Sequence, residues 1–258
     1  MGLLGRSELS DVYQAEAEDG SGKWALKISS AALWTSLARE AEIGALLRHP
    51  GIVRVSRLFP AGDRWVLQME YCPGQTLDQA MPANEVQVSE LRPIAEALDY
   101  AHSRGIVHCD VKPGNILLKD GFAKLLDFGI SQPIGNVQTC NGTPAYMAPE
   151  RISADPIALD GRSDQYSLGV VAWRILSGST PFHGETAREL MIAVKRDPLP
   201  RLRVGGGEAC EPVQALLRRA LSRQPAQRFE SCVEFLDSLV AHFSAPARRK
   251  SPEPSPLS

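Results

Sequence analysis

The chain has 258 residues, of which 43% are hydrophobic and 22% charged, and its formal net charge is −2. This composition is typical of a globular protein with a sizeable core, built as one large domain or two lobes. The small net charge gives no electrostatic basis for binding nucleic acid or an acidic membrane surface. No stretch approaches the roughly 20 apolar residues of a membrane span, and we see neither a signal peptide nor a zinc-type cysteine spacing. We therefore expect a cytoplasmic protein.

The first third of the chain predicts a strand and a helix. Residues 24–28 alternate as in a strand, which places Ala25 and Lys27 on one face. Residues 31–48 carry an apolar stripe at helical spacing, formed by Leu33, Leu37, Ile43 and Leu47. Glu40 falls within that stripe, and a carboxylate facing a core is costly unless it is paired. Lys27 is the obvious partner.

Two further elements lead to the middle of the chain. Residues 65–69 predict another strand. This strand should end in the residues that follow, up to Pro73 and Gly74. Residues 89–103 predict a helix with one apolar face, formed by Leu91, Ile94, Ala95, Leu98 and Ala101. This helix would lead directly into the stretch that carries the chemistry.

Residues 106–129 contain a predicted β-hairpin. Two apolar runs, 116–118 and 122–126, flank Asp120-Gly121, a dipeptide that favours a two-residue turn. This turn pairs Lys119 with Phe122. Asn115 would then lie opposite Leu126, at the open end of the hairpin.

The hairpin register places Asn115 beside Asp127. An amide oxygen and a carboxylate suit a hard cation that keeps its waters and shares phosphate oxygens, so we predict magnesium. Asp110 and Lys112 precede them in the same loop, and an acid, a cation and a metal together indicate phosphoryl transfer. Singly, such residues more often cap turns or remain solvated.

The segment His108-Cys109-Asp110-Val111-Lys112-Pro113-Gly114-Asn115, followed by Asp127-Phe128-Gly129, resembles the catalytic loop and metal motif of eukaryotic-like (Hanks-type) protein kinases. Lysine two residues after the aspartate is typical of the Ser/Thr enzymes. The resemblance covers about residues 3–243, and the absence of long insertions is similar to bacterial members.

The resemblance implies an ATP site in the first part of the chain. Residues 5–12 take the place of the glycine-rich loop, and Gly5, Ser7, Val12 and Ala25 are expected to contact the nucleotide. Only the first of three expected glycines is present, so the backbone is less free to approach phosphate. The loop also begins very near the start of the sequence and leaves few residues for a first strand, so that strand is expected to be short or to begin upstream of the sequence.

Further nucleotide contacts follow from the same resemblance. Lys27, held by Glu40, would bind the α- and β-phosphates. Met69 would line the back of the adenine pocket, and the backbone of Glu70 and Cys72 would hydrogen-bond the base.

Gly44 stands one turn after Glu40, where relatives bury a larger side chain that stacks towards Phe128. Glycine inside a helix costs about 1 kcal/mol relative to alanine. We expect a thinner stack and a mobile helix.

The segment after the hairpin bears on regulation and on the substrate. Cys109 replaces an arginine that in relatives binds a phosphate, which weakens the case for control by phosphorylation at Thr139. Cys109 and Cys140 are candidates for oxidation, although inert packing is the commoner role.

Residues 142–147 resemble the segment that seats a peptide, with Thr143 bonding Asp110 and Lys112. Gly114 replaces an acid that favours basic peptides.

Three residues have structural roles by the same resemblance. Asp164 would hold the backbone of the catalytic loop, as well as cap its own helix at residues 163–173. Arg228 would form a buried pair with Glu150.

We predict an α+β, two-lobed protein-kinase fold. It comprises a small antiparallel-sheet lobe with one helix at about 1–70, a hinge at 70–74 and a mainly helical lobe at about 75–243. Residues 244–258 are Pro- and Ser-rich and should be a disordered tail.

The predicted function is magnesium-dependent transfer of the γ-phosphoryl group of ATP to serine or threonine of a protein substrate. Asp110 and Lys112 would be catalytic, and Asn115 and Asp127 would bind magnesium. A pseudokinase is the alternative, favoured by the poor glycine-rich loop. A small-molecule phosphotransferase is the third option, against which the peptide-seating segment argues. The sequence carries no signal for an oligomeric state.

Overall fold

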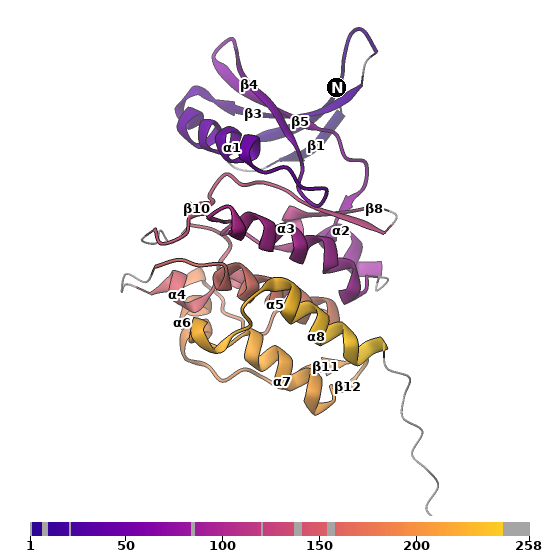
Figure 1. The fold of residues 1–258 in the computed structure, drawn as a ribbon, viewed down its shortest axis with the longest axis vertical. Coiled ribbons are helices and arrows are strands. Elements are labelled where there is room, and N and C mark those ends of the chain that lie inside the picture. The colour runs from indigo at the N-terminus through magenta and orange to yellow at the C-terminus, as the bar shows by residue number, and fades with distance from the viewer. Residues whose placement is uncertain are drawn as a thin grey trace, which may run out of the picture.

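The chain folds into a small sheet lobe stacked on a larger, mainly helical lobe (Figure 1). The computed structural model describes residues 2–6, 10–20, 22–83, 86–119, 121–136, 141–153 and 158–244. The predicted phosphosite Thr139, Cys140, Ser7 of the glycine-rich loop and the tail beyond Ser244 lie outside the described residues. The two-lobed α+β fold predicted from the sequence is confirmed.

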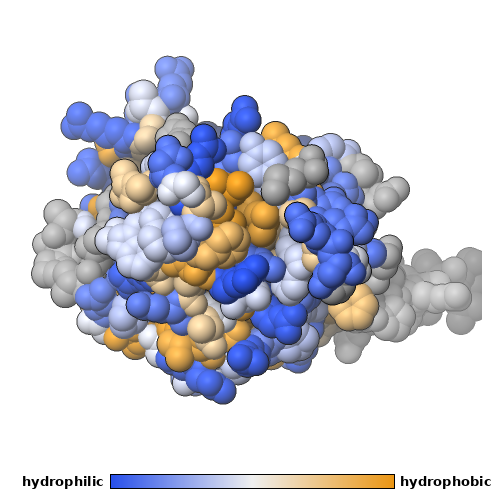
Figure 2. Space-filling model, turned by 90° about the horizontal axis from the view of Figure 1, so that it is seen from above, coloured by the Kyte–Doolittle hydropathy of each residue, from blue (hydrophilic) through white to orange (hydrophobic). Residues whose placement is uncertain are grey.

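The small lobe is built on a five-stranded antiparallel sheet with strand order β1-β2-β3-β5-β4. The strands are β1 (Gly2–Arg6), β2 (Asp11–Glu16), β3 (Lys23–Ser30), β4 (Val55–Ala61) and β5 (Arg64–Glu70). One face packs on the helix α1, and the other carries partly exposed apolar residues such as Leu3 and Leu26. Seen from above, apolar side chains gather in the middle of the small lobe with hydrophilic ones around them (Figure 2). Antiparallel sheets commonly have one solvated face of this kind.

The predicted first helix is present but shorter than expected. Residues Ala31–Leu33 form a 3-10 turn, and α1 then runs over Trp34–Leu46 rather than to residue 48. Leu47 is extended. Pro50 favours extended backbone at His49, so the helix is expected to end before that residue, and it does so at Leu46. Leu37, Glu40 and Ile43 are buried as the stripe predicts.

Gly44 in α1 does not leave a gap. A Cβ atom placed on Gly44 would lie 2.3 Å from Cγ2 and 2.7 Å from Cβ of Val55. The side chain of Val55, on β4, therefore occupies the space where a larger residue at position 44 would lie. The space beside Gly44 is therefore filled, while the thinner stack towards Phe128 and the mobility of the helix stay predictions.

We expect Gly44→Ala to lower the free energy of unfolding by up to about 2 kcal/mol. Alanine has the better helix propensity by about 1 kcal/mol, but overlap in a packed interior costs about 1–3 kcal/mol. Adding Val55→Ala, which removes both Cγ methyl groups, should restore part of the loss. Urea denaturation measures both effects, with Ser36→Ala on the exposed side of α1 as the control. Additive effects of the two substitutions would contradict the contact.

The predicted hairpin lies at the junction of the lobes. Strands β8 (Ile116–Lys119) and β9 (Phe122–Leu125) pair with Lys119 opposite Phe122, which confirms the predicted register. The backbone of Leu125 also bonds to Gly51 and Val53, in the connection between α1 and β4. The hairpin therefore belongs to both lobes.

Gly74, in the segment predicted to be the hinge, lies against this hairpin. Its φ is +147°, and a Cβ atom there would lie 2.4 Å from the carbonyl oxygen of Leu118. Only glycine allows this approach. The next residues form β6 (Gln75–Thr76), which pairs with β8, and α2 (Leu77–Ala80).

The large lobe packs its helices around α5 (Arg162–Ser177). The other helices are α3 (Arg92–Ser103), α4 (Pro149–Ile152), α6 (Ala187–Arg196), α7 (Glu211–Ala220) and α8 (Cys232–Ser244). Short strand pairs complete the lobe, β7 (Ile106–Val107) with β10 (Gln132–Pro133) and β11 (Arg203–Val204) with β12 (Gly207–Glu208). Every residue of α5 from Ser163 to Trp173 is buried.

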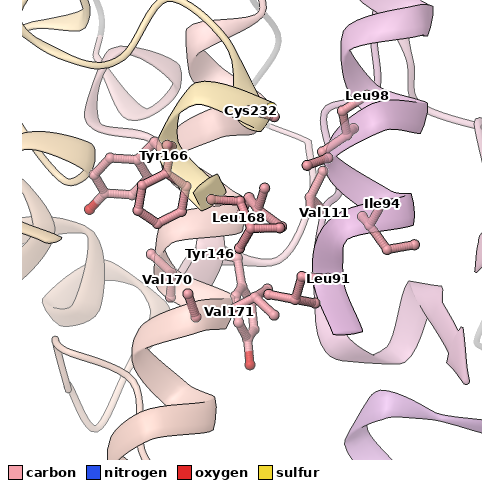
Figure 3. Packing of buried hydrophobic residues seen from close by; sticks show 14 of the residues in the cluster. Leu91, Ile94, Leu98, Val111, Tyr146, Tyr166, Leu168, Val170, Val171 and Cys232 are labelled. Atoms are coloured by element: carbon pink, nitrogen blue, oxygen red, sulfur yellow. The ribbon is translucent and has the colours of Figure 1, made fainter. Parts of the chain in front are cut away.

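The core of the large lobe lies between α3 and α5. Figure 3 shows Leu98 of α3 and Val111 on the side of α3 that faces Leu168 of α5, and all three side chains are fully buried. The predicted helix at 89–103 starts as a 3-10 turn, Val88–Leu91, and becomes α-helical where Pro93 fits the first turn. Among the described residues, no helix is both long and apolar enough to span a membrane.

Candidate active site

A cavity of about 340 Å³ lies at the junction of the lobes. It is lined by ten of the residues that the sequence predicted for nucleotide or metal: Gly5, Val12, Ala25, Lys27, Glu40, Met69, Glu70, Cys72, Asn115 and Asp127. Several apolar lining residues were not predicted from the sequence, among them Val53, Leu117 and Leu126. Their position follows from the pairing of β9 with the α1–β4 connection, which no local pattern indicates.

The pair predicted between β3 and α1 is present. Nζ of Lys27 lies 2.7 Å from Oε2 of Glu40 and 3.0 Å from Oδ1 of Asp127. Burial works to lower the pKa of Lys27, but the charges of Asp127 and Glu40 outweigh it and raise that pKa to about 12. Lys27 therefore remains an ammonium group that faces the cavity.

Glu40 and Asp127 differ in their electrostatics. Burial and the nearby charge of Asp127 raise the pKa of Glu40 to about 7, although Lys27 counteracts both. Burial also works to raise the pKa of Asp127, but Lys27 and the N–H of Gly129 together hold that pKa below its usual value. Asp127 is thus the carboxylate that stays ionised in the cavity.

Asn115 and Asp127 lie at the open end of the hairpin, where the register predicts them. The N–H of Leu126 bonds to the carbonyl oxygen of Asn115 at 2.8 Å, which confirms their predicted pairing. Nδ2 of Asn115 donates to the backbone oxygen of Asp110 at 2.9 Å and to its Oδ2 at 3.0 Å. Because Asp110 takes the amide hydrogens, the Oδ1 atom of Asn115 faces the other way.

Asp110 forms a compact cluster with Lys112 and Thr143. Nζ of Lys112 lies 2.7 Å from Oδ2 of Asp110 and donates to the hydroxyl of Thr143 at 2.8 Å. Both the N–H and the hydroxyl of Thr143 donate to Oδ1 of Asp110, at 3.2 Å and 3.1 Å. The contacts predicted for Thr143 are therefore present.

Asp164 of α5 holds the backbone of the predicted catalytic loop, residues 108–115. Its carboxylate accepts from the N–H of His108 at 2.7 Å and of Cys109 at 2.9 Å, as predicted. The predicted capping role is not present, because α5 begins at Arg162 with Gly161 as its N-cap.

Within the loop, His108 is buried between its neighbours. Its Nδ1 accepts from the N–H of Asp110 at 3.1 Å, so Nε2 is the atom that donates to the carbonyl oxygen of Leu126, at 2.9 Å. The ring meets Phe128 edge-on, with centroids 4.6 Å apart. His108 thus connects the catalytic loop to the segment that carries Asp127.

Cys109 is not suited to the oxidation that the sequence analysis considered. It is 2% exposed, and burial together with the charge of Asp164 raises the pKa of its thiol to about 12. Since the thiolate is the reactive form, this thiol should be inert.

The predicted pair between Arg228 and Glu150 is present and deeply buried. NH2 and NH1 of Arg228 donate to Oε2 at 2.6 Å and Oε1 at 2.8 Å of Glu150. NH1 also donates to the carbonyl oxygen of Arg162, at the start of α5. The pair joins α4, α5 and the segment before α8.

His102, on α3, is a residue that the sequence analysis missed. Its Nε2 lies 2.8 Å from Oδ2 of Asp164, and its Nδ1 lies 3.8 Å from Oδ1 of Asp99. Burial works to lower the pKa of His102, but these two carboxylates raise it to about 9. The thiol of Cys232 lies beside them, protonated because burial raises its pKa well above the usual value. A histidine on the apolar side of a helix was the only sequence signal.

We expect His102 to make stability fall with pH. The pKa of His102 is about 9 in the folded protein, above the ordinary value of 6.5. The stability that protonated His102 contributes is therefore complete below pH 6.5 and is lost as the pH rises through 9. Relative to His102→Gln, the wild type should lose up to about 3 kcal/mol of unfolding free energy over this range. Urea titrations between pH 6 and 9.5 measure this difference, with the exposed His183→Gln as the control. A constant difference over the whole range would contradict the assignment.

A sheet lobe and a helical lobe that enclose such a cavity define the class of proteins with a protein-kinase fold. The chain belongs to the protein kinase domain family, whose pattern matches residues 1–242. The Hanks-type resemblance read from the sequence is thereby confirmed.

The chain is also similar to bacterial proteins named as Ser/Thr-protein kinases. PknJ of Mycobacterium tuberculosis is 32% identical, over 98% of this chain and 46% of its own length. PknH of Mycobacterium tuberculosis is 32% identical, over 93% of this chain and 40% of its own length. Pkn2 of Myxococcus xanthus is 30% identical, over 94% of this chain and 32% of its own length. The chain thus spans less than half the length of these relatives.

Proposed function

We propose that this domain transfers the γ-phosphoryl group of ATP to serine or threonine hydroxyls of a protein substrate. The observation that carries the proposal is the arrangement around the cavity. Lys27 is ion-paired on one side of it, and Asn115 and Asp127 line it near the loop that holds Asp110. Phosphoryl transfer depends mainly on positioning and charge neutralisation, and these residues supply both.

Each polar residue has a distinct role in this proposal. Lys27, fixed by Glu40, positions the nucleotide phosphates. Asp110 accepts the proton of the substrate hydroxyl or orients it, and Lys112 neutralises charge on the transferring group. The backbone at Glu70 and Cys72 holds the adenine, against Val12, Ala25 and Met69.

The residues that line the cavity also suit magnesium. Asp127 stays ionised. Asn115 can offer its side-chain oxygen, Oδ1, because its side-chain Nδ2 donates to Asp110. Two oxygen ligands with room for water and phosphate oxygens are the set that Mg²⁺ prefers. When bound, the ion would neutralise charge on the nucleotide phosphates.

A protein substrate is favoured by the segment around Thr143. This residue bonds both Asp110 and Lys112, which places the backbone of residues 141–146 beside the proposed proton acceptor. A peptide laid along that backbone would bring its hydroxyl to Asp110. The relatives' names, Ser/Thr-protein kinase, support the same choice of acceptor.

Transfer of radioactive phosphate from ATP tests the proposal, with the protein itself and a generic basic protein as acceptors. The wild type should label serine or threonine only when magnesium is present, and Asp127→Asn should label neither acceptor. Asp63→Asn, at the exposed turn between β4 and β5, is the matched control and should retain full activity. No transfer by the wild type, with a nucleotide-induced rise in Tm, would instead indicate a pseudokinase.

A further inference from the structure

Arg151, the residue after Glu150 in α4, lies buried beneath the catalytic loop. It is 3% exposed, and none of the ion pairs among the described residues includes it. Its NH1 donates to the carbonyl oxygen of Cys109, and its NH2 donates to the carbonyl oxygen of Asn141 at 2.5 Å. Its buried Nε has no partner among the described residues, so its contacts are those of the two terminal nitrogens. One guanidinium group thus joins two segments that are far apart in the sequence.

The first of these segments needs such a contact. Cys109 has a φ of +71°, in the left-handed region that costs a non-glycine residue about 1–3 kcal/mol. Such a conformation persists only when the surroundings impose it. Here the N–H of Cys109 is held by Asp164, and its carbonyl oxygen is held by Arg151. The peptide that follows leads directly to Asp110.

The second segment leads to Thr143. Gly142, which follows Asn141, has a φ of +127°, and a Cβ atom there would lie 3.2 Å from the carbonyl oxygen of Cys109. The two segments therefore touch where Arg151 joins them. Thr143 comes next and donates its N–H and its hydroxyl to Asp110.

We propose that Arg151 is a positioning residue that sets Asp110 and Thr143 relative to each other, by binding the carbonyl oxygens of Cys109 and Asn141. This inference rests on the proposed function, because it assigns Arg151 to the geometry of the proposed transfer. The connection consists of one side chain and two backbone oxygens, so it requires no phosphate on the protein. Asp110 and Thr143 are then held in place without phosphorylation.

The charge balance supports a permanent connection. Position 109 carries an uncharged thiol. Among the described residues, Arg151 is the cation that binds backbone oxygens of both segments, while Lys112 joins the same segments through the side chains of Asp110 and Thr143. A buried guanidinium is costly unless its hydrogens are bonded, and the two carbonyl oxygens bond one hydrogen each of NH1 and NH2, while the buried Nε has no partner among the described residues. Releasing either segment would leave a buried donor unsatisfied.

Arg151→Met and Arg151→Lys test the proposal in the full chain. Displacement of reacting groups by about 1 Å can cost about 100-fold in rate. Arg151→Met should therefore lower kcat by about 10- to 100-fold, with the KM for ATP and the nucleotide-induced rise in Tm unchanged. Arg151→Lys should recover part of kcat, because one ammonium group can reach one carbonyl oxygen at a time. Treatment of the wild type with a protein phosphatase should leave kcat within about threefold.

Amide hydrogen exchange supplies a readout that does not depend on activity. In Arg151→Met, exchange should accelerate in peptides covering 106–112 and 141–147, and stay unchanged in α5. Arg228→Met, which removes another buried arginine, controls for general loss of stability and should accelerate exchange across α4 and α5. Unchanged exchange at 106–112 and 141–147, an unchanged kcat in Arg151→Met, or loss of activity on phosphatase treatment would overturn the proposal. An inactive wild type whose exchange responds as expected would refute the proposed function and leave the connection by Arg151 supported.

Discussion

Asp110→Asn should lower kcat by about 10³-fold while nucleotide binding is retained. Asparagine has the same shape but is neither a proton acceptor nor a charge partner for Lys112, which lies 2.7 Å from Oδ2. General base catalysis is worth about 10²- to 10⁴-fold, and loss of the charge pair adds to the effect. Because Asp110 does not line the cavity, the KM for ATP should change little.

Steady-state phosphate transfer to a peptide, together with Tm shifts on addition of ATP and magnesium, measures this effect. Asp63→Asn again provides the matched change at an exposed turn. Thr143→Ala should give an intermediate loss, since it removes the hydroxyl contacts of Asp110 and Lys112 but keeps the bond from its N–H. A kcat for Asp110→Asn within threefold of wild type would exclude Asp110 as the proton acceptor.

Arg228→Met should lower the free energy of unfolding by about 3–5 kcal/mol. Breaking a buried ion pair leaves its partner as an uncompensated charge, and Glu150 is 4% exposed. Adding Glu150→Gln should recover part of the loss, because the remaining group is then neutral. The matched control is Arg218→Met, which breaks an exposed pair with Glu211 and should cost less than about 1 kcal/mol.

The pair of Arg228 and Glu150 also makes the stability of the protein depend on pH in the acid range. Burial works to raise the pKa of Glu150, but Arg228 outweighs it and holds that pKa below the ordinary value of 4.5. The folded pKa is therefore the lower one, and the stability from this group is present above pH 4.5 and lost as pH falls through the folded pKa. The wild type should lose stability over this range, and Arg228→Met should lose less. Urea denaturation at pH 3.5 to 7 measures the free energy of unfolding of the wild type and of Arg228→Met. Parallel pH profiles for the two proteins would contradict the assignment of this pH dependence to the pair.

Much of the candidate site could be predicted because its residues lie close together in the sequence. The turn at residues 120–121 fixed the hairpin register, which placed Asn115 opposite Leu126 before any tertiary contact was known. The pairing of Lys27 with Glu40 was predicted from the apolar stripe of the helix, whereas the contacts of Thr143 and Asp164 were implied by family resemblance.

What could not be predicted depends on packing between distant segments. Val55 fills the space beside Gly44 because β4 crosses α1, and no pattern in either segment indicates that crossing. Arg151 has the sequence appearance of an ordinary helix residue, and only the fold places it against Cys109. His102 likewise required the approach of α3 to α5.

The burial of residues 163–173 in α5 limits where the domain can tolerate substitutions. A typical surface helix tolerates substitution on one side, so a mutational scan shows a period of 3.6 residues. In α5 every residue from Ser163 to Trp173 is buried, so no tolerant side exists along that stretch. Its first turn also carries Asp164, which holds the proposed catalytic loop. A scan of α5 should therefore show unbroken intolerance, and the variability that adapts the domain to new substrates must arise in other elements.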